Sequence, residues 1–482
     1  MWPSADMHIT HESSPHQQRR VNHHARHLHA YDFFNLLTGS TLLDRVERHL
    51  PPHRERLYPP TDTLSLFMAQ SLNPDRACQQ VVNRHAVERI ANGLKPCSTH
   101  TGAYCKARQR LPLEMARSLA RETGQQIAKQ AQADWLWLGR AVKLVDGTTV
   151  TLPDTPMNQA MYPQQSIQKS GLGFPIARLV GLMCAATGAV LDAAIGPYSG
   201  KDVATSRNMD VATSRNMTGS EHALFRELLG SIAAGDLILA DRYYCAYFVI
   251  ALLQRQGADV LFQQHQRRLT DFRKGRRLGS RDHVVAWVKP KICPSWLTRE
   301  QYDAFPDTLE VREIKIDSKV LVTTLLCAAQ APKKTLGELY ASRWNIELDL
   351  RNIKTTLGME RLHCKTPVMN EKELWTYLLA YNLIRLLMTE SARQADVLPR
   401  LLSFKHSLQL WLAWSHAGPP DFEEASVRLL YGLIAQQRVG NRPGRIEPRA
   451  VKRRPKPYPL LMKPRPLDRA DVRLHGHPKK LK

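Results

Sequence analysis

The pattern of hydrophobic residues between positions 141 and 240 limits the fold more than any other feature of the sequence. Residues 141–152 (AVKLVDGTTVTL) alternate in polarity and are rich in β-branched side chains, which is typical of a half-buried strand. Residues 175–186 and 188–196 predict a hairpin. The amphipathic run 221–232 predicts a helix that leads into a fourth strand at 236–240. Three adjacent strands followed by a helix and another strand predict an α/β layer.

Two acidic residues occupy unusual places in this predicted layer. Asp146 lies inside the first strand, and Asp241 directly follows the fourth, at the carboxyl end where α/β sheets bind their ligands. A carboxylate within an apolar strand is costly without a partner. Each acid alone has an ordinary explanation, because Asp146 could begin a turn at Gly147 and Asp241 could pair with Arg242.

A third acidic residue lies in the segment YASRWNIELDLRNIK, which predicts one continuous helix from Tyr340 to Lys354. Tyr340, Arg343, Glu347 and Lys354 fall within a stripe about 60° wide at ~100° per residue. The neighbouring apolar stripe consists of Leu339, Ile346, Leu350, Ile353 and Leu357. The ordinary interpretation is an amphipathic helix with charges at its rim. Together with the two earlier acids, the pattern instead predicts three carboxylates that share divalent ions, for which Mg²⁺ suits the oxygen donors.

Composition favours a polyanionic partner. The chain has 482 residues, 43% of them hydrophobic, so it can bury a core and is expected to form two to four domains. The chain has 68 Lys and Arg residues against 44 Asp and Glu. The resulting net charge of +24 indicates nucleic acid as the binding partner. The eight scattered cysteines indicate a reducing cytoplasm. The N-terminus lacks a signal-like apolar run, and charged and glycine residues interrupt the most apolar stretch, 177–196, so no membrane association is expected.

The two ends of the chain are basic. Residues 438–482 carry fifteen Lys or Arg against three Asp or Glu, half of the net charge of +24, together with eight prolines. This composition predicts an extended basic strap on DNA, and the alternative is a solvated tail that aids solubility. Residues 1–50 contain a cluster of histidines among arginines. We interpret it as a solvated basic arm rather than a metal site, because acidic or cysteine partners are missing.

Two further segments have clear secondary-structure patterns. Residues 51–135 contain three helical patterns separated by glycine and proline, which predict a small helical domain whose basic helices could enter a DNA groove. Residues 263–328 contain three strand-like runs and the basic stretch RRLTDFRKGRRLGSR, which predict a β-rich insertion with a DNA-facing loop. Such an insertion accounts for the long separation of Asp241 from Glu347.

The acids and their flanking residues resemble one known family. DGTT at Asp146, ADRYY around Asp241 and the spacing Tyr340-x2-Arg343-x3-Glu347-x6-Lys354 are similar to the DDE transposases of the insertion-sequence-4 family. The resemblance extends from about residue 61 to the C-terminal tail. It implies an RNase H-like core in which Asp146, Asp241 and Glu347 are catalytic and bind two divalent ions, Mg²⁺ or in substitution Mn²⁺. It also implies that Tyr340, Arg343 and Lys354 contact DNA phosphates.

These patterns and the resemblance together predict the domain organisation. We expect a basic arm, a helical DNA-binding domain, an RNase H-like core in two parts around a β-rich insertion, a helical segment and a basic tail. The corresponding residues are 1–50, 51–135, 136–262 with 329–395, 263–328, 396–437 and 438–482. The octapeptide DVATSRNM occurs twice in tandem over 202–217, which indicates a duplicated coding stretch in a connecting loop.

The expected function is that of a bacterial cytoplasmic, nucleoid-associated transposase. It would bind the terminal inverted repeats of an insertion sequence, pair two ends as a homodimer, and cut and rejoin double-stranded DNA at both the repeats and the target. Two alternatives remain open on the sequence. One is an inactive DNA-binding copy that inhibits transposition, and the other is a two-metal nuclease without strand transfer.

Overall fold

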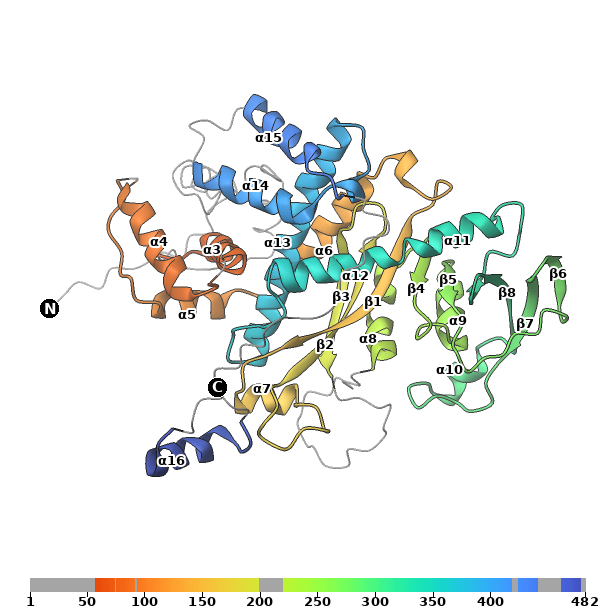
Figure 1. Cartoon of the computed structure of the whole chain (residues 1–482), viewed down its shortest axis with the longest axis horizontal. Helices are drawn as coiled ribbons and strands as arrows, with labels where there is room; N and C mark the ends of the chain where they lie inside the picture. The colour runs from red at the N-terminus through yellow and green to blue at the C-terminus, as the bar shows by residue number, and fades with distance from the viewer. Residues whose placement is uncertain are drawn as a thin grey trace, which may run out of the picture.

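The computed structural model describes residues 57–73, 75–91, 93–198, 220–417, 424–440 and 461–477. Its centre is a nine-stranded sheet with the strand order β3-β2-β1-β4-β5-β9-β8-β7-β6, and helices lie against both faces (Figure 1). The mixed α/β class predicted from the sequence is confirmed. The predicted N-terminal arm and the tandem octapeptide lie outside the described residues.

The first half of the sheet contains the four strands predicted between positions 141 and 240. β1 (Val142–Thr151), β2 (Ile176–Cys184) and β3 (Val190–Pro197) are antiparallel neighbours, so the predicted hairpin is confirmed. α8 (Glu221–Glu227) and the short 3-10 helix Leu229–Ser231 precede β4 (Leu237–Ala240), which pairs in parallel with β1 and with β5 (Asp259–Gln263).

Strand alternation sends side chains to two separate hydrophobic cores. On β4, Leu237 and Leu239 belong to the core shared with α13 (Pro367–Gln394), whereas Ile238 and Ala240 belong to the core on the opposite face. β1 alternates in the same way, with Leu144 in the first core and Val145 in the second. This period of two fixes which face each strand residue presents.

The second half of the sheet contains the strands expected in residues 263–328. β6 (Arg276–Gly279), β7 (Asp282–Val288), β8 (Thr308–Ile316) and β9 (Lys319–Thr323) form an antiparallel run that joins the first half through β5 and β9. The strands thus extend the central sheet rather than form a separate one. α10 (Arg299–Asp303) lies between β7 and β8 in the sequence, whereas α9 (Tyr247–Arg255) connects β4 to β5 and packs on β5.

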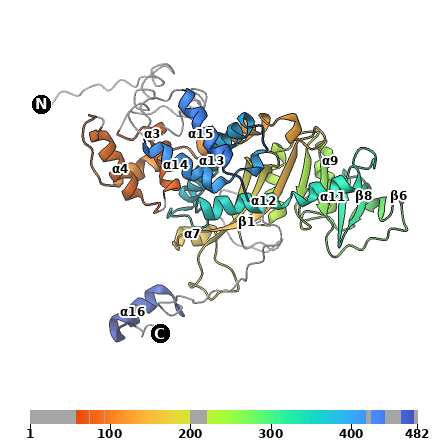
Figure 2. The ribbon, with the colours of Figure 1, turned by 45° about the horizontal axis from the view of Figure 1, so that its top comes forward.

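Helices gather at the other end of the sheet (Figure 2). The helical segments predicted in 51–135 are present, and α13 is buried along most of its length because it packs between N-terminal and C-terminal helices. The remaining helices are α3 (Pro60–Leu72), α4 (Cys78–Ala91), α5 (Gly102–Arg110), α6 (Leu113–Lys129), the 3-10 helices Ala133–Trp135 and Pro399–Leu401, α7 (Pro156–Met161), α14 (Phe404–Ala417) and α15 (Glu424–Gln436). No helix among the residues described is both long and apolar enough to cross a membrane.

The prediction of one continuous helix from Tyr340 to Lys354 is wrong. α11 (Lys333–Ala341) ends before Ser342, α12 (Trp344–Arg351) follows, and a π-helix spans Asn352–Thr356. At the break, the Ser342 hydroxyl donates to the Leu339 carbonyl at 2.6 Å, and the Arg343 amide donates to Tyr340 at 3.1 Å. Such three-residue bonds tighten the turn, and a serine side chain that bonds its own backbone competes with helix continuation.

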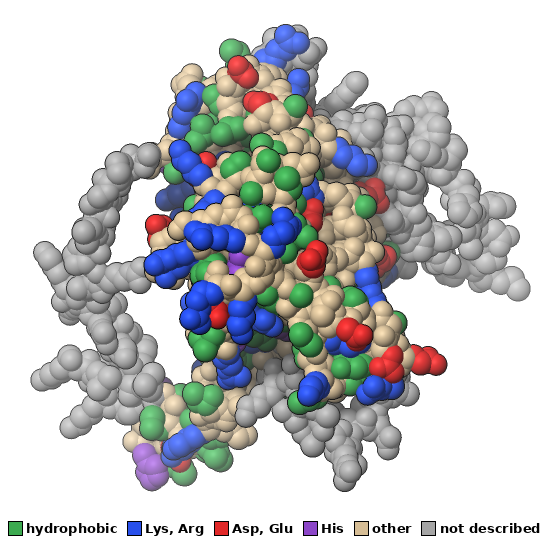
Figure 3. All heavy atoms as spheres, turned by 90° about the vertical axis from the view of Figure 1, so that its right-hand side faces the viewer, with side chains coloured by type: hydrophobic (Ala, Val, Ile, Leu, Met, Phe, Trp, Pro, Cys, Tyr) green, Lys and Arg blue, Asp and Glu red, His purple; other side chains and the backbone are tan. Residues whose placement is uncertain are grey.

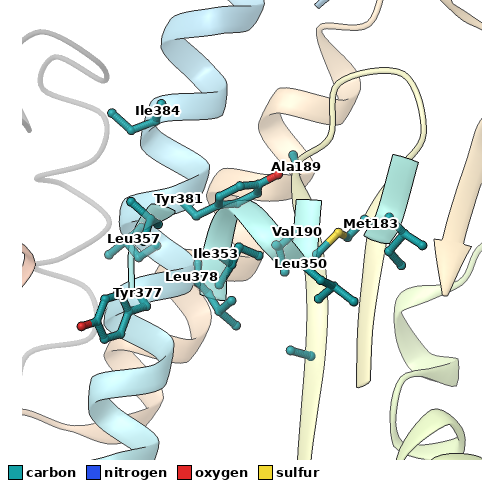
Figure 4. Close-up of a cluster of buried hydrophobic side chains, with 14 of the residues drawn as sticks. Met183, Ala189, Val190, Leu350, Ile353, Leu357, Tyr377, Leu378, Tyr381 and Ile384 are labelled. Carbon is teal, nitrogen blue, oxygen red and sulfur yellow. The ribbon is translucent and has the colours of Figure 1, made fainter. Parts of the chain in front are cut away.

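The apolar stripe predicted on this segment is confirmed despite the break. Leu339, Ile346, Leu350, Ile353 and Leu357 are all buried. Figure 4 shows Leu350, Ile353 and Leu357 in a cluster with side chains of α13 and of the β2–β3 hairpin. The prediction of an extended strap over residues 438–482 is wrong for residues 465–475, which form α16 (Arg465–His475), while residues 441–460 and 478–482 lie outside the described ranges. The start of α16 agrees with Pro466 in the first turn, where proline costs no hydrogen bond.

Candidate active site

Asp146 and Asp241 lie on neighbouring strands and on the same face of the sheet. Asp146 continues the alternation of Val142 and Leu144, and Asp241 continues that of Leu237 and Leu239, so both are directed toward the face covered by α12. β1 and β4 pair in parallel up to Leu144 and Leu239, two residues before each acid, which places Asp146 and Asp241 next to each other at the carboxyl end of β4. Asp146 Oδ1 accepts from the Gly147 amide at 2.8 Å, and Asp241 Oδ1 accepts from the Tyr243 amide at 2.8 Å.

Arg343 connects the third acid to the first. Its Nη2 donates to Glu347 Oε1 at 2.8 Å, one helical turn away, and its Nη1 lies 3.8 Å from Asp146 Oδ2. The guanidinium is largely buried, with 15% of the side chain exposed, whereas the Glu347 side chain is 35% exposed. A single cation therefore lies between carboxylates that come from a strand and from a distant helix.

The Asp146 carboxyl has a raised pKa of about 6, against an ordinary value of 3.8. Burial is the largest cause, and the negative charges of Asp241 and Glu221 raise the pKa further, while the Gly147 amide and Arg343 lower it. A carboxyl that resists ionisation beside other acids binds a proton or a cation favourably. Such perturbed groups are common at catalytic sites.

Glu221 is a member of this acidic group that the sequence pattern did not predict. It is the first residue of α8, whose N-cap is Ser220, and its Oε1 lies 3.7 Å from Arg178 Nε. Burial raises the Glu221 pKa, Arg178 lowers it, and the charge of Asp241 raises it. A Cβ on Gly147 would lie 2.7 Å from Glu221 Cδ, so the glycine leaves the space that this side chain uses. The Ser–Glu helix start was visible in the sequence, but its proximity to Asp146 was not.

A pocket of about 410 Å³ opens between β1 and α12. Asp146 and Glu347 line it together with Lys354, which the π-helix carries. Arg351 and Glu360 also line it, and neither was predicted from the sequence. The pocket thus combines two of the predicted carboxylates with cationic side chains, as a site for a phosphate-bearing ligand requires.

Tyr340 does not line this pocket. It is 6% exposed and lies at the end of α11, and burial raises its pKa to about 12, with Arg343 lowering and Asp241 raising the value. The phenol therefore stays neutral, a hydrogen-bonding group near Arg343 and Asp241. Trp344, the next residue after Arg343, is 58% exposed.

Within the described ranges, no three His, Cys, Asp or Glu side chains lie close enough together to hold one metal ion. Asp146 and Glu347 contact Arg343 instead. The donor set itself fits a hard divalent cation, because it consists of carboxylate oxygens and because Asp241 and Glu221 destabilise the ionised form of Asp146. A cation shared by these acids would relieve that repulsion.

Comparison with known proteins identifies the family. Residues 137–383, just over half of the chain, match the family model "Transposase DDE domain". The chain is 29% identical over 427 residues to the transposase InsG of insertion sequence element IS4 from Escherichia coli (strain K12), a match that covers 85% of this chain and 89% of InsG. The piggyBac transposase synaptic complex with hairpin DNA aligns over 86% of both chains at 8% identity, with a TM-score of 0.41. The chain belongs to the DDE transposases, in the insertion-sequence-4 family.

Proposed function

We propose that this transposase binds the terminal inverted repeats of its own insertion sequence and moves the element by cut-and-paste cleavage and strand transfer, with two metal ions at Asp146, Asp241 and Glu347. The observation that carries the proposal is that Arg343 lies between Asp146 and Glu347, two acids that line one pocket together with Lys354. A carboxylate pair held around a cation is suited to exchange that cation for metal ions.

The three acids divide into two from the sheet and one from a helix. Asp146 and Asp241 would hold the ions at the carboxyl end of β4, and Glu347 would complete the site from α12. Bound Mg²⁺ or Mn²⁺ would activate the attacking oxygen, first of water and then of the 3′ hydroxyl, and would stabilise the leaving oxygen. Because the pKa of Asp146 is raised to about 6, this residue would release a proton when ions bind at about pH 6 or below.

Three residues of the helical signature would hold the DNA backbone. Lys354 lies in the pocket, and Arg343 is able to reach a phosphate once ions replace it between the acids. Tyr340 contributes a neutral hydroxyl next to Arg343. Arginine suits this role because its planar guanidinium binds a phosphate through two parallel hydrogen bonds.

The basic stretch of the β-rich insertion supplies a second DNA surface. Figure 3 shows Lys and Arg side chains gathered on the end of the molecule formed by the second half of the sheet. The exposed cationic residues in this stretch are Arg267, Arg268, Arg273, Lys274, Arg276, Arg277 and Arg281. We propose that this surface and the C-terminal tail of residues 438–482 bind phosphates without reading the sequence.

The proposal also includes the domain organisation that the sequence predicts. The order β3-β2-β1-β4-β5, with an antiparallel trio followed by parallel strands, supports an RNase H-like core. β6 to β9 would then be the insertion of residues 263–328, and the helices of 51–135 a DNA-binding domain. Two copies would pair the two transposon ends as a homodimer on double-stranded DNA, in the bacterial cytoplasm at the nucleoid.

Replacement of the acids tests the proposal. Asp146→Ala, Asp241→Ala and Glu347→Ala should each abolish Mg²⁺-dependent cleavage of DNA that carries the terminal repeats, while the affinity for uncleaved ends stays nearly unchanged. Asp134→Ala, at an exposed acid outside the site, serves as the matched control. Cleavage by all three site variants would contradict the assignment. A wild-type protein that cuts but never joins ends to a target would instead indicate a nuclease without strand transfer, and one that binds but never cuts would indicate an inactive copy.

A further inference from the structure

Asp349, two residues after Glu347 on α12, has a buried environment unlike that of the catalytic acids. Its side chain is 1% exposed, and both oxygens are occupied. Oδ1 pairs with the guanidinium of Arg385 on α13 and lies 3.0 Å from the Tyr381 hydroxyl. Oδ2 accepts from Arg400 Nη1 at 2.6 Å. A carboxylate with two arginines and a phenol is fully satisfied and directed away from the pocket that Glu347 lines.

Arg400 carries the contact onward to the sheet. Its Nε donates to the carbonyl of Ala185, in the turn between β2 and β3, at 2.7 Å, and its Nη2 donates to the carbonyl of Cys184, the last residue of β2, at 2.9 Å. The planar guanidinium of Arg400 thus donates in three directions, once to the Asp349 carboxylate on α12 and twice to backbone carbonyls of the β2–β3 hairpin. Such a fork fixes distance and orientation together.

The turn between β2 and β3 has room for both arginines because residue 188 is a glycine. Gly188 has a φ of +79°, and a Cβ at this position would lie 2.7 Å from Arg385 Cζ and 3.0 Å from Arg400 Nη1. The Gly188 carbonyl lies 3.0 Å from the Tyr381 hydroxyl, which also accepts from Arg385 Nε at 2.7 Å. Side chains from α12, α13 and the segment after α13 therefore converge on one backbone turn.

This turn is in register with the strand that carries Asp146. β2 pairs with β1, so that Cys184 lies opposite Lys143 and Gly181 lies opposite Asp146. The contacts of Asp349 consequently connect the helix of Glu347 to the strand pair of Asp146. The hydrophobic contacts of Ile346 and Leu350 hold α12 on the core, but apolar packing alone permits small rotations and shifts.

The short α12 has a particular need for such a connection. It has eight residues, a tight turn at Ser342 precedes it, and the π-helix Asn352–Thr356 follows it. Because both ends of α12 are irregular, the adjoining backbone constrains the rotation of α12 less than a continuous α-helix would. Directional bonds to a buried charge supply a single preferred orientation, as buried polar groups do in other systems where they fix register.

We propose that Asp349 is a positioning residue, which through Arg385 and Arg400 fixes the rotation of α12 so that Glu347 faces Asp146 across the metal-binding pocket. The proposal rests on the proposed function, because it assumes that Glu347 is a metal ligand. Asp349 touches neither the ions nor DNA and acts only through the helix. Displacement of a catalytic group by about 1 Å is enough to cost ~100-fold in rate.

The affinity for Mn²⁺ is the deciding measurement, because an ion pair that only stabilises the fold would leave this affinity unchanged. Binding of Mn²⁺ to the full-length protein is followed by the loss of the free-ion signal in electron paramagnetic resonance. Asp349→Asn should remain folded, as judged by circular dichroism, and should bind Mn²⁺ about 10- to 100-fold more weakly, the range seen when partners that orient metal ligands are removed. Wild-type affinity in folded Asp349→Asn would overturn the proposal.

Arg400→Lys covers the case in which Asp349→Asn does not fold. Arg400 lies at the rim of the network, with 16% of its side chain exposed, and lysine keeps its charge but lacks the planar fork whose three nitrogens contact the carboxylate and the two carbonyls. A weaker affinity for Mn²⁺ is expected here too, and an unchanged affinity would overturn the proposal. Asp282→Asn is the matched control, because Asp282 forms a comparably buried bidentate pair with Arg312 in the second half of the sheet. It should lower stability without changing the affinity for Mn²⁺.

Glu347→Ala separates this proposal from the proposed function. If Glu347→Ala weakens Mn²⁺ binding and Asp349→Asn does not, only the positioning role fails. If Glu347→Ala leaves Mn²⁺ binding unchanged, the metal site itself is misassigned.

Discussion

Arg343 donates to the Glu347 carboxylate at 2.8 Å. The same guanidinium lies 3.8 Å from Asp146, so it holds two acids of the proposed metal site at opposite sides of one positive charge. Its positive charge offsets part of the destabilisation of ionised Asp146 that burial and the charge of Asp241 cause. In the proposed catalytic cycle, Arg343 moves from the acids to a DNA phosphate when the ions arrive.

Removal of the Arg343 guanidinium should therefore have opposite effects on the affinity for metal ions and on the affinity for DNA. We expect Arg343→Ala to bind Mn²⁺ more tightly, because a competing cation is removed. It should bind terminal-repeat DNA more weakly, with the slope of log K against log salt reduced by about 0.9 for the one phosphate that Arg343 would neutralise. Fluorescence anisotropy over a salt series measures the slope. Lys334→Ala, which removes an exposed lysine from α11, is the control, and an unchanged slope in Arg343→Ala would exclude the phosphate interaction.

The raised pKa of Asp146 predicts the sign of a stability change with pH. Between about pH 4 and pH 6 the folded protein binds more protons at Asp146 than the unfolded chain does, so the free energy of unfolding falls as pH rises through this window. Asp146→Asn should lose this slope and should be more stable than wild type at pH 7 without metal, by at most about 3 kcal/mol. Urea unfolding at pH 4, 5, 6 and 7 in chelator measures it. A less stable Asp146→Asn at pH 7 would contradict the raised pKa.

Glu221 should shift the pKa of Asp146 but should not be required for metal binding. Because its charge raises the pKa of Asp146, Glu221→Gln should lower that pKa, and the pH at which Mn²⁺ binding reaches half of its maximum should fall. Calorimetric titration with Mn²⁺ between pH 5 and pH 8 reveals the shift. Glu338→Gln on the exposed side of α11 is the control for the removal of a negative charge. A pH profile identical to that of wild type would mean that Glu221 does not influence Asp146.

The basic tail should contribute affinity but not catalysis. The structure shows where to cut it, because the Val439 amide donates to Leu401 and the Ser403 amide to Gln437, so these residues belong to the folded helical part. Truncation after residue 440 should weaken DNA binding and flatten its salt dependence, by about 0.9 for each phosphate that the tail neutralises. The comparison is made on repeat-containing and unrelated DNA of equal length. A salt slope equal to that of the full chain would mean that the tail is only solvated.

Much of the candidate site was predictable because it follows from local patterns. Alternating polarity identified β1, and a short apolar run after a predicted helix identified β4, which placed Asp146 within a strand and Asp241 after one. The spacing around Glu347 identified its buried and exposed faces. The break at Ser342 was not predictable from periodicity, because a turn of three-residue bonds keeps the hydrophobic positions close to their helical phase.

The contacts between distant segments could not be derived from the sequence. Glu221 is close to Asp146 only because β1 and the start of α8 meet in space, and Gly147 gives no sign of this on its own. Asp349 looked like one more charge on an amphipathic helix, although it is buried against Arg385 and Arg400. Burial of a charge depends on partners from elsewhere in the chain, which periodicity does not reveal.

The most direct test of the central claim is a structure of the full-length protein bound to terminal-repeat DNA in Mn²⁺, with the ions located by anomalous scattering. We predict two Mn²⁺ ions held by Asp146, Asp241 and Glu347 beside the scissile phosphate, with Arg343 turned away from both acids onto the DNA backbone. Ions bound elsewhere, or Arg343 still between Asp146 and Glu347 in a complex that is competent to cleave, would contradict the account.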